Sequence, residues 1–301
     1  MRILVTGAGG FVGRAVSRHL QVHGHLVLPW PGRHRLDLTD MHAVKGWLEE
    51  ADPIDAVVHL AGASTVRESW QDPARYYATN LGGTANLLAG LRVNPGQPVR
   101  VVFASTSAVY GSHRDGTLSE DLDLRPSNPY AATKAAAEQL LEYETLAGGI
   151  GTTTLRLFNV AGGLDGIVDS NPTRIINNCL RAAAGEIPQV NVNGDGSARR
   201  EFTHVGDVAE AFRLAVETTT VGASRTYNVG TGVGVSMKEV IDTARGVTRV
   251  DFGVVYNPPV DEPQTLIAEV SKVRAELGWM PERSSLEQVI GDAWRFRTDL
   301  S

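Results

Sequence analysis

A tyrosine and a lysine four residues apart, Tyr130 and Lys134, are the side chains best placed to perform chemistry. Residues four apart lie on one face of a helix, one turn from each other. A nearby ammonium favours the phenolate and lowers the pKa of a tyrosine from its reference value of about 10. Such a tyrosine can take up and return a proton at neutral pH. The same spacing also arises by chance, in which case Tyr130 is an ordinary half-buried helix residue.

Hydroxyl side chains follow an apolar run shortly before this pair. Val101, Val102 and Phe103 are typical of a buried strand, and a Ser-Thr-Ser sequence begins two residues later at Ser105. Open α/β sheets bind their ligands at the carboxyl ends of the strands. We therefore expect a hydroxyl here, on Ser105 or Thr106, to hydrogen-bond the substrate oxygen that the tyrosine serves.

The elements that must position these residues alternate between strand and helix. The first half of the chain predicts strands at 3–6, 25–28, 55–60, 99–104 and 152–158, with helices at 11–23, 41–50, 73–91 and 128–147. This alternation is typical of right-handed βαβ units and a parallel sheet covered by helices on both faces. The predicted fold class is α/β, a Rossmann-type doubly wound parallel sheet with a smaller C-terminal substrate lobe.

Glycines and prolines become frequent after Asn159 and indicate a second lobe built from loops and a few helices. We expect helices at 173–184, 205–217, 272–277 and 285–297, and a short strand at 227–229. The predicted dinucleotide-binding domain is 1–160, to which 204–231 returns. The predicted substrate lobe is 161–203 together with 232–301.

A glycine-rich turn joins the first strand to the first helix. Gly7, Gly10 and Gly13 permit a tight turn, the close approach of a pyrophosphate and close packing of helix on strand. The anion would lie on the N–H groups at the helix N-terminus, which belong to Phe11, Val12 and Gly13. The turn therefore predicts a dinucleotide cofactor.

The choice between NAD and NADP stays open at this stage. An Asp or Glu at the end of the second strand normally binds the adenosine ribose, and here that strand ends in Pro29 and Pro31 without a carboxylate. Arg33 and Arg35 follow and could hold a 2′-phosphate, as NADP requires, or could be solvated loop charges. We expect Asp37 and Leu38 near the adenine.

Composition excludes several classes of protein. The chain has 301 residues and a net charge of −6, which does not favour a nucleic-acid or anionic-membrane partner. Its single cysteine, Cys179, rules out a disulfide framework and favours the cytoplasm. The eight histidines lack metal-ligand spacing with a cysteine, so no metal site is predicted. We expect neither a signal peptide nor a membrane span.

Together these motifs resemble the extended short-chain dehydrogenase/reductase family, specifically its NAD-dependent nucleotide-sugar epimerase/dehydratase group and, within it, the UDP-glucose 4-epimerases. The resemblance covers nearly the whole chain. Besides the glycine turn and the Tyr-Lys pair, it includes the motifs His59–Gly62, Asn80–Leu88, Arg156–Asn159, Gly194–Val205, Tyr227–Gly230 and Leu277–Trp279.

The resemblance implies a role for each matching residue. Tyr130 is the acid and base on the sugar hydroxyl, Lys134 lowers its pKa and holds the nicotinamide ribose, and Thr106 is the catalytic hydroxyl. The implied cofactor contacts also include Leu60, Ala61, Gly62, Val160 and Asn80. Asn80 also supports the active-site helix. The implied contacts to the nucleotide sugar are Ser105, Asn159, Asn178, Cys179, Val192, Asn193 and Arg200, with Arg200 on the diphosphate.

Some positions depart from the family pattern. Ser107 and Ala108 follow Thr106 where 4,6-dehydratases carry Asp-Glu, which argues against dehydration. Pro258 and Pro259 stand where many epimerases have a second diphosphate arginine, so diphosphate binding depends on Arg200. Ser64 occupies a site that is basic in some epimerases.

The predicted activity is 4-epimerisation of a nucleotide sugar, a UDP-hexose of the UDP-glucose/UDP-galactose type, by transient oxidation at C4. An alternative is an NADPH-dependent 4-ketoreductase acting on a nucleotide-linked deoxysugar, which the missing strand-two carboxylate and Arg33 favour. A non-catalytic dinucleotide sensor and other sugar chemistry, such as uronic-acid epimerisation or decarboxylation, are further alternatives.

The family also implies a homodimer formed by the helices at 73–91 and 128–147, with Tyr76, Leu140 and Leu141 as apolar candidates for that interface.

Overall fold

The chain forms two compact units in this computed structural model, which describes residues 1–94, 99–111, 116–260 and 263–298. Unit 1 comprises Met1–Gly111, Glu120–Leu157 and Ala209–Tyr227, and unit 2 comprises Ser112–Ser119, Phe158–Val208 and Asn228–Ser301. The assignment of one domain to the cofactor and one lobe to the sugar stays a prediction.

Unit 1 is built on a six-stranded sheet with the order β12-β5-β4-β3-β1-β2. Pairing is parallel from β2 through β1, β3 and β4 to β5. The strands are β1 (Arg2–Thr6), β2 (Leu26–Pro29), β3 (Ala56–His59), β4 (Val99–Thr106), β5 (Ile150–Leu157) and β12 (Ser224–Val229). Because β2 and β3 flank β1, the strand order reverses direction there, and such a switch point is where doubly wound sheets bind their ligands.

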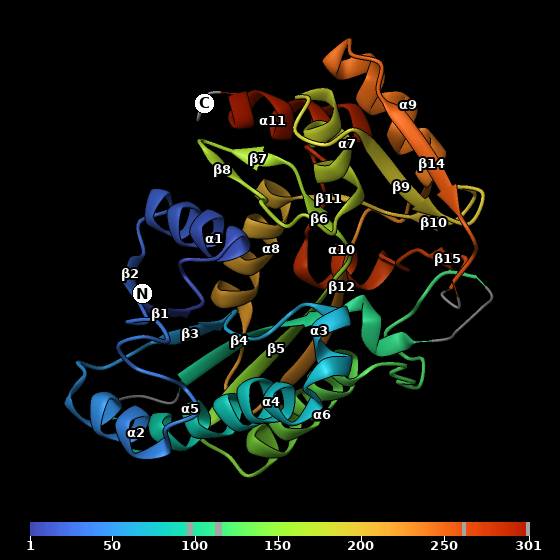
Figure 1. Cartoon of the computed structure of the whole chain (residues 1–301). Helices are drawn as coiled ribbons and strands as arrows, with labels where there is room; N and C mark the ends of the chain where they lie inside the picture. Colours follow the sequence, from blue (N-terminus) through green and yellow to red (C-terminus); the bar gives the residue numbers. More distant parts are fainter. Residues whose placement is uncertain (95–98, 112–115, 261–262, 299–301) are drawn as a thin grey trace. The chain divides into compact units, whose positions relative to one another are not determined.

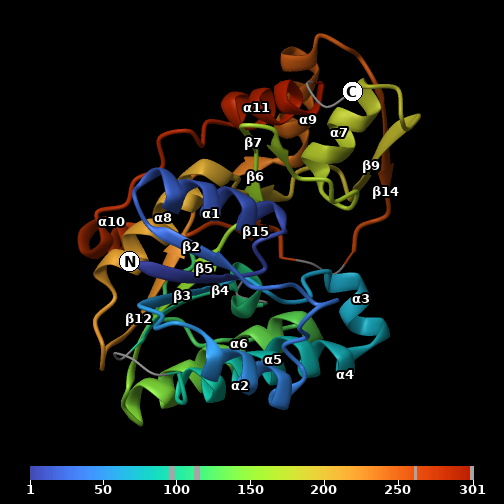
Figure 2. The ribbon, with the colours of Figure 1, turned by 90° about the vertical axis from the view of Figure 1, so that its left-hand side faces the viewer.

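Helices cover both faces of this sheet, as Figures 1 and 2 show: α2, α5 and α6 lie on one face, and α1 and α8 on the other. The prediction of a Rossmann-type doubly wound fold is confirmed. The helices are α1 (Phe11–Val22), α2 (Met41–Glu50), α3 (Val66–Gln71), α4 (Pro73–Tyr76), the π-helix η1 (Tyr77–Gly82), α5 (Gly83–Leu91), the 3₁₀ helix η2 (Ser107–Tyr110), α6 (Pro129–Leu146) and α8 (Val205–Thr218).

A hydrophobic cluster fixes α2 and α5 on the sheet. Val44 and Leu48 from α2 pack with Leu87 from α5 and with Val57 and Phe103 from the sheet, all fully buried. Burying apolar area of this kind is the main favourable contribution to folding. The strand that carries the candidate active-site hydroxyls, β4, is therefore held in place by packing against this cluster.

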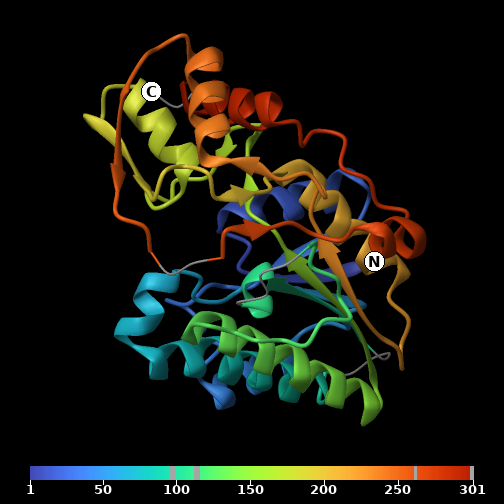
Figure 3. The same ribbon diagram turned by 90° about the vertical axis from the view of Figure 1, so that its right-hand side faces the viewer.

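Unit 2 gathers helices around short strands, and Figure 3 shows α7, α9 and α11 together. The helices are α7 (Ile175–Ala183), α9 (Met237–Thr248), α10 (Ser271–Leu277) and α11 (Leu286–Thr298). The strands are β6 (Val160–Ala161), β7 (Gly163–Leu164), β8 (Ile167–Val168), β9 (Gln189–Asn193), β10 (Arg199–Arg200), β11 (Thr203–His204), β13 (Val235–Ser236), β14 (Gly253–Asn257) and β15 (Thr265–Leu266).

The helix α9 and the short strands of unit 2 were not among the predicted elements. The helix α9 begins at a capping box in which the Ser236 hydroxyl accepts from the Glu239 N–H and the Glu239 carboxylate accepts from the Ser236 N–H. The parallel pair of β9 and β14 joins Gln189 to Gly253, which are far apart in sequence. Such pairing cannot be derived from local pattern.

Two of the three apolar residues offered for a dimer interface lie instead in the core. Tyr76 is fully buried and its hydroxyl donates to the Thr65 carbonyl oxygen at 2.7 Å, and Leu141 is 1% exposed. The exposed apolar side chains on η1 and α6 are Tyr77, Tyr143 and Leu146. Among the described residues, none of the helices is long and apolar enough to span a membrane.

Candidate active site

The start of α6 holds the Tyr-Lys pair. The Asn128 carboxamide accepts a hydrogen bond from the Ala131 N–H at 2.9 Å, and Pro129 occupies the first turn, so the sequence Asn-Pro starts the helix here. Tyr130 follows in the same turn and is half-buried, and Lys134 lies one turn later and is 5% exposed.

The Lys134 ammonium is anchored on the end of β4. It donates to the Ala104 carbonyl oxygen at 2.8 Å and lies 4.4 Å from the centroid of the Phe103 ring. Burial lowers the pKa of Lys134 to about 8, while the charge of Glu138 acts in the opposite direction. The lysine therefore loses its proton at a lower pH than an exposed lysine does.

Thr106, the last residue of β4, provides the hydroxyl of the strand end. It is half-buried, and its Oγ1 accepts from the Ala108 N–H at 3.2 Å, which caps η2. Ser105 points to the opposite face because side chains alternate along a strand. Its hydroxyl is buried and donates to the Glu138 carboxylate, which also pairs with Arg156 at 2.8 Å. The structure thus separates Ser105 from Thr106 and gives Ser105 a structural partner.

Asn80, in the π-helix η1, connects a loop to the active-site helix. Its Oδ1 accepts from the Ala63 N–H at 2.8 Å, and its Nδ2 donates to the Ala63 carbonyl at 3.0 Å and to Thr133 Oγ1 at 2.9 Å. The Thr133 hydroxyl donates in turn to the Tyr130 carbonyl oxygen at 2.7 Å. The Asn80 amide thus holds the first turn of α6, as the family resemblance implies, and π-helical segments often occur at functional sites.

The glycine turn fits a dinucleotide because it has no room for side chains. Gly7 has a φ of +70°, and a Cβ there would lie 2.8 Å from the Ala61 nitrogen. A Cβ on Gly13 would lie 2.0 Å from the Gly7 carbonyl oxygen. Gly10 is the N-cap of α1, and Phe11, Val12 and Gly13 form its first turn, whose N–H groups lack partners within the helix. Free N–H groups at a helix N-terminus can hold an anion such as a pyrophosphate, and that role of the turn stays a prediction.

His59 lies beneath this turn, and the sequence analysis did not predict a separate role for it. His59 is 2% exposed, with Nδ1 at 2.7 Å from Thr6 Oγ1 and Nε2 at 2.9 Å from Thr84 Oγ1. Burial, assisted by the charge of Lys134, lowers the pKa of His59 to about 3. The Thr6 hydroxyl also accepts from the N–H groups of Leu60 and Ala61, at 3.2 and 3.1 Å. His59 therefore stays neutral and fixes the loop that continues to Gly62.

Gly62 adjoins both the amide and the ammonium. A Cβ at this position would lie 2.9 Å from Asn80 Oδ1 and 3.6 Å from Lys134 Nζ. The loop at 60–62 therefore passes the active-site helix closely. Its role as a lining of the cofactor site stays a prediction.

The acidic group after the second strand is Asp37. Its Oδ1 accepts from the Thr39 N–H and hydroxyl, both at 2.9 Å, and its Oδ2 lies 3.3 Å from Arg33 Nε. The Thr39 backbone hydrogen bond is the main cause of a lowered pKa for Asp37. Leu38 is buried, and its carbonyl oxygen accepts from Asn86 Nδ2 at 2.8 Å. Arg33 thus has a carboxylate partner within its own loop.

The polar substrate candidates of unit 2 are placed mainly by the backbone. Asn159 is exposed, and its Nδ2 donates to the Glu201 carbonyl oxygen at 3.0 Å. Arg200 Nη1 donates to the carbonyl oxygens of Arg199 and Gln264, at 2.9 and 3.3 Å. Asn178 is half-buried on α7, and Asn193 is exposed at the end of β9.

The apolar candidates of unit 2 lie in its interior. Cys179 is fully buried, and burial raises the pKa of its thiol to about 12. Val192 is 3% exposed and Val160 is 6% exposed. In this structure these side chains pack the core, so a ligand contact at these positions would have to come from the backbone.

A buried carboxylate next to Arg200 was also missed by the sequence reasoning. Glu201 is fully buried and accepts from the N–H groups of Ala268, Thr231 and Gly232. Burial raises its pKa in spite of these hydrogen bonds. Glu201 ties three segments together and so fixes the backbone that carries Arg200.

Known proteins support the family suggested by these motifs. The chain is 33% identical to the UDP-glucose 4-epimerase of Corynebacterium glutamicum, over 100% of this chain and 97% of that protein. Among solved structures it is similar to a UDP-glucose 4-epimerase from Stenotrophomonas maltophila with bound NAD and formylated UDP-arabinopyranose, with a TM-score of 0.91, 28% identity and coverage of 100% and 98%. It is also similar to RMD from Pseudomonas aeruginosa complexed with NADPH, with a TM-score of 0.85, 28% identity and 98% coverage of both chains.

The family model described as the NAD dependent epimerase/dehydratase family matches residues 3–230. This range includes the glycine turn, the Thr106 strand end and the Tyr130–Lys134 pair. The family predicted from the sequence is confirmed. This chain belongs to the NAD dependent epimerase/dehydratase family.

Proposed function

We propose that this chain is an NAD-dependent nucleotide-sugar 4-epimerase of the UDP-glucose/UDP-galactose type. The observation that carries the proposal is the start of α6, where half-buried Tyr130 precedes a buried Lys134 whose ammonium lies on the end of β4. Relatives named UDP-glucose 4-epimerase match the chain over its full length, which agrees with this activity.

Tyr130 is the proposed acid and base. As a phenolate it takes the proton of the sugar 4-hydroxyl, and as a phenol it gives the proton back on the return step. Lys134 favours the phenolate through its positive charge. Thr106 donates to the same sugar oxygen, and the Asn80–Thr133 link keeps the first turn of α6 in place. A fixed donor geometry of this kind lowers the barrier because less reorganisation is needed during the reaction.

The glycine turn would hold the pyrophosphate of the cofactor, and Asp37 and Leu38 would lie near its adenine. NAD, when bound, supplies the hydride acceptor at C4 and returns the hydride to the sugar. Leu60, Ala61, Gly62 and Val160 are proposed to line the cofactor site. Gly7 and Gly13 support this assignment most directly, because the backbone of the turn leaves no room for a Cβ atom at either position.

Unit 2 is proposed to bind the nucleotide diphosphate. Arg200 would form a charge-assisted pair with a phosphate, and its guanidinium is already oriented by two backbone carbonyl groups. Asn159, Asn178 and Asn193 would supply amide hydrogen bonds to the substrate, which we take to be a UDP-hexose.

The ketoreductase alternative is favoured by one observation, the similarity to a structure solved with NADPH. In that reaction Tyr130 would donate a proton to a keto oxygen once, without the return step. The ion pair of Arg33 with Asp37 argues the other way, because it gives Arg33 a partner other than a 2′-phosphate.

The deciding experiment incubates the freshly purified chain with UDP-galactose and no added cofactor, in D₂O, and follows the anomeric protons by NMR. Epimerisation predicts UDP-glucose that carries no deuterium at C4, because the hydride returns from a tightly held cofactor. Denaturing the same sample should release NAD. A sample that converts nothing, and that oxidises NADPH with a nucleotide-linked 4-ketosugar, would establish the reductase instead.

A homodimer and a cytoplasmic location complete the proposal. Tyr77, Tyr143 and Leu146 are 43%, 61% and 75% exposed on η1 and α6, the helices that the family resemblance implies for the interface. Sedimentation velocity would test the dimer. The single cysteine favours a reducing compartment.

A further inference from the structure

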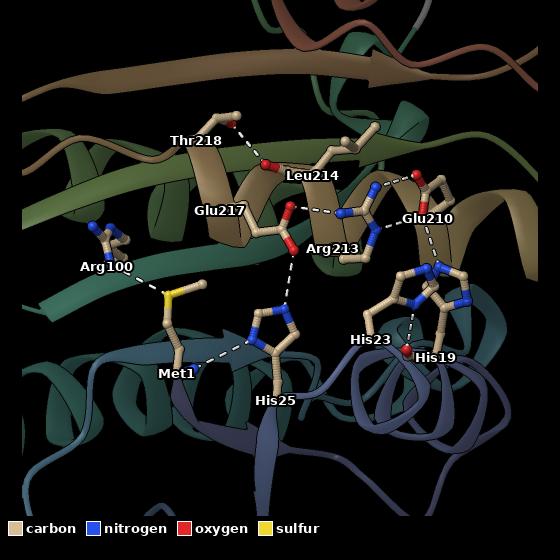
Figure 4. A network of polar contacts seen from close by, with 10 residues as sticks. All are labelled: Met1, His19, His23, His25, Arg100, Glu210, Arg213, Leu214, Glu217 and Thr218. Carbon is tan, nitrogen blue, oxygen red and sulfur yellow. Dashed lines mark hydrogen bonds and ion pairs between the residues drawn. The ribbon is translucent and has the colours of Figure 1, made fainter.

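Two histidines and a glutamate gather on unit 1 in a place that the proposed reaction does not use. His19 lies in the last turn of α1, His23 is the C-cap of that helix, and Glu210 belongs to α8. Their ligand atoms all lie within 4.8 Å of one another. Figure 4 shows the two imidazole rings side by side next to the Glu210 carboxylate. The set is therefore compact enough to be bridged by one ion.

His23 is held in the orientation and tautomer that a metal ligand requires. Its Nδ1 lies 2.8 Å from the His19 carbonyl oxygen, which can only accept, so Nδ1 carries the hydrogen. In the neutral ring the lone pair is then on Nε2. Metal-ligating histidines typically donate their other N–H to a backbone carbonyl in this way. His23 thus already makes the hydrogen bond to a backbone carbonyl that orients a metal-ligating imidazole.

The spacing of the two histidines is that of a helical chelate. His19 and His23 are four residues apart, their ring centroids are 4.3 Å apart, and the planes are tilted by 49°. Two histidines at this spacing on one helix face are a recurrent way of binding zinc. The rings are therefore close enough to share an ion without a change in the helix.

Glu210 completes the set from another helix. Its Oε2 lies 2.7 Å from His19 Nε2, a hydrogen-bond distance at which the histidine proton occupies the space between them. A metal ion would replace that proton. Ligand atoms of tetrahedral zinc are separated by roughly 3.4 Å, given metal–ligand distances of about 2.0–2.1 Å. The His19–Glu210 pair would open by less than 1 Å, on the order of a side-chain adjustment.

The charges around His19, His23 and Glu210 also favour the binding of a cation. Arg213 contacts both oxygens of Glu210, with its Nε 2.8 Å from Oε2 and its Nη2 2.5 Å from Oε1. The same guanidinium contacts Glu217 through Nη1 at 2.5 Å from Oε2. Two carboxylates and one guanidinium leave one net negative charge. The C-terminal end of α1 adds a negative potential, which favours cations at that position.

We propose that His19, His23 and Glu210 form a binding site for a divalent transition-metal cation, of which Zn²⁺ is the best match. Two imidazoles and a carboxylate are ligands that zinc accepts, and a water molecule would take the fourth position. The ion would join the imidazole groups at the end of α1 to the Glu210 carboxylate of α8, and so connect the two helices within unit 1. The site is at the opposite end of α1 from the glycine turn, about 18 Å away for a helix of 12 residues.

The distinguishing variant is His23→Ala. It removes one proposed ligand but leaves the His19–Glu210 pair and the Arg213 contacts in place, so folding should be unaffected. The matched control is His42→Ala, an exposed histidine on α2 outside the set. All proteins must carry no polyhistidine tag, because a tag would itself bind the metal.

The experiment titrates Zn²⁺ alone into each protein, by calorimetry and by competition with a chromophoric chelator. We expect one equivalent to bind to the parent and to His42→Ala with a Kd in the micromolar range or below. We expect His23→Ala to bind at least tenfold more weakly. Co²⁺ as a second probe should give the visible absorption of a tetrahedral ion with the parent, and none with His23→Ala.

Three outcomes would overturn the proposal: no zinc bound by the parent at micromolar concentration, equal affinity in His23→Ala, or an equal loss in His42→Ala. If His23→Ala melts at a lower temperature than the parent without metal, His23→Gln replaces it as the test. The reaction in Proposed function is assayed separately, so the failure of one proposal does not decide the other.

Discussion

The two units place their candidate residues in contrasting ways. In unit 1, Lys134 is buried and Tyr130 is tied, through Thr133, to the Asn80 side chain, so each group has a partner that fixes it. In unit 2, Asn159 and Asn193 are exposed and Arg200 contacts backbone carbonyl groups. The proposed proton-transfer site is therefore preorganised, whereas the proposed nucleotide-sugar site presents side chains to solvent.

This difference matches the separate demands of the two tasks. Proton transfer needs atoms at defined distances, and small displacements reduce the rate strongly. A sugar that must be attacked from either face needs a pocket that is loose around the hexose and firm around the nucleotide. Substitutions in unit 1 should consequently change turnover, and substitutions in unit 2 should change substrate affinity.

The largest effect is expected from Tyr130→Phe. Because no other group in unit 1 is proposed to exchange the proton, turnover should fall by about 10³-fold or more, within the range for loss of a general acid–base. The NAD content after gel filtration should not change. Tyr143→Phe, on the same helix and 61% exposed, is the matched control and should keep full activity. A variant that retains a tenth of the parent's turnover would remove Tyr130 from the proposed role.

Arg200→Ala tests the other half of the comparison. Losing a hydrogen bond to a charged group costs about 1.5–3 kcal/mol, so the Kd for a UDP-hexose should rise roughly 10–100-fold. Retention of NAD should not change. Arg199→Ala, the neighbouring residue, pairs with Glu239 at 3.5 Å and serves as the control. Equal weakening in both variants would exclude a specific contact between Arg200 and the diphosphate.

The share of the fold and of the site that could be predicted from the sequence also differs between the two units. The helix at 41–50 was predicted with the bounds that the structure has, because its apolar positions follow a helical period. The Tyr-Lys pair and the glycine turn are local motifs and were predicted directly. Ser105, by contrast, has Glu138 as its partner, and Cys179 lies in a core, both of which depend on contacts distant in sequence.

The proposed metal ligands illustrate the same limit. His19 and Glu210 are 191 residues apart, so no spacing rule relates them. The helix α9 was not predicted, although Ser236 and Glu239 form a capping box that could have indicated its start. Local signals therefore predict chemistry and helix boundaries, and tertiary contacts decide which candidates stay in the site.

A pH-dependence test addresses His59, one of two histidines that are buried among the described residues. His59 in unit 1 has its pKa lowered to about 3, mainly by burial, and His204 in unit 2 is also buried with a lowered pKa, but lies 3.3 Å from Asp292. The folded state keeps His59 neutral, whereas the unfolded state binds a proton below pH 6.5. The stability due to the neutral form is therefore present above that pH and is lost as pH falls.

Between pH 7 and pH 5 this single group should cost about 2 kcal/mol of unfolding free energy. His59→Asn removes the titrating group and should reduce the loss over that interval by about this amount, as measured by urea unfolding at both pH values. His42→Asn, an exposed histidine, should leave the pH dependence unchanged. The same loss in the parent and in His59→Asn would mean that His59 is not the group responsible.

The smallest effect is expected at Arg33, which decides between NAD and NADP. The Arg33 side chain is 68% exposed and lies 3.3 Å from Asp37, and exposed pairs of this kind contribute little. Under the epimerase proposal, Arg33→Ala should change the affinities for NAD and NADP by less than about threefold, since Arg33 then pairs with Asp37 and makes no contact with the cofactor. Fluorescence titration of both reduced cofactors into protein freed of its own dinucleotide would measure this. A selective loss of NADPH affinity greater than tenfold would show that Arg33 leaves Asp37 to bind a 2′-phosphate, and would favour the ketoreductase.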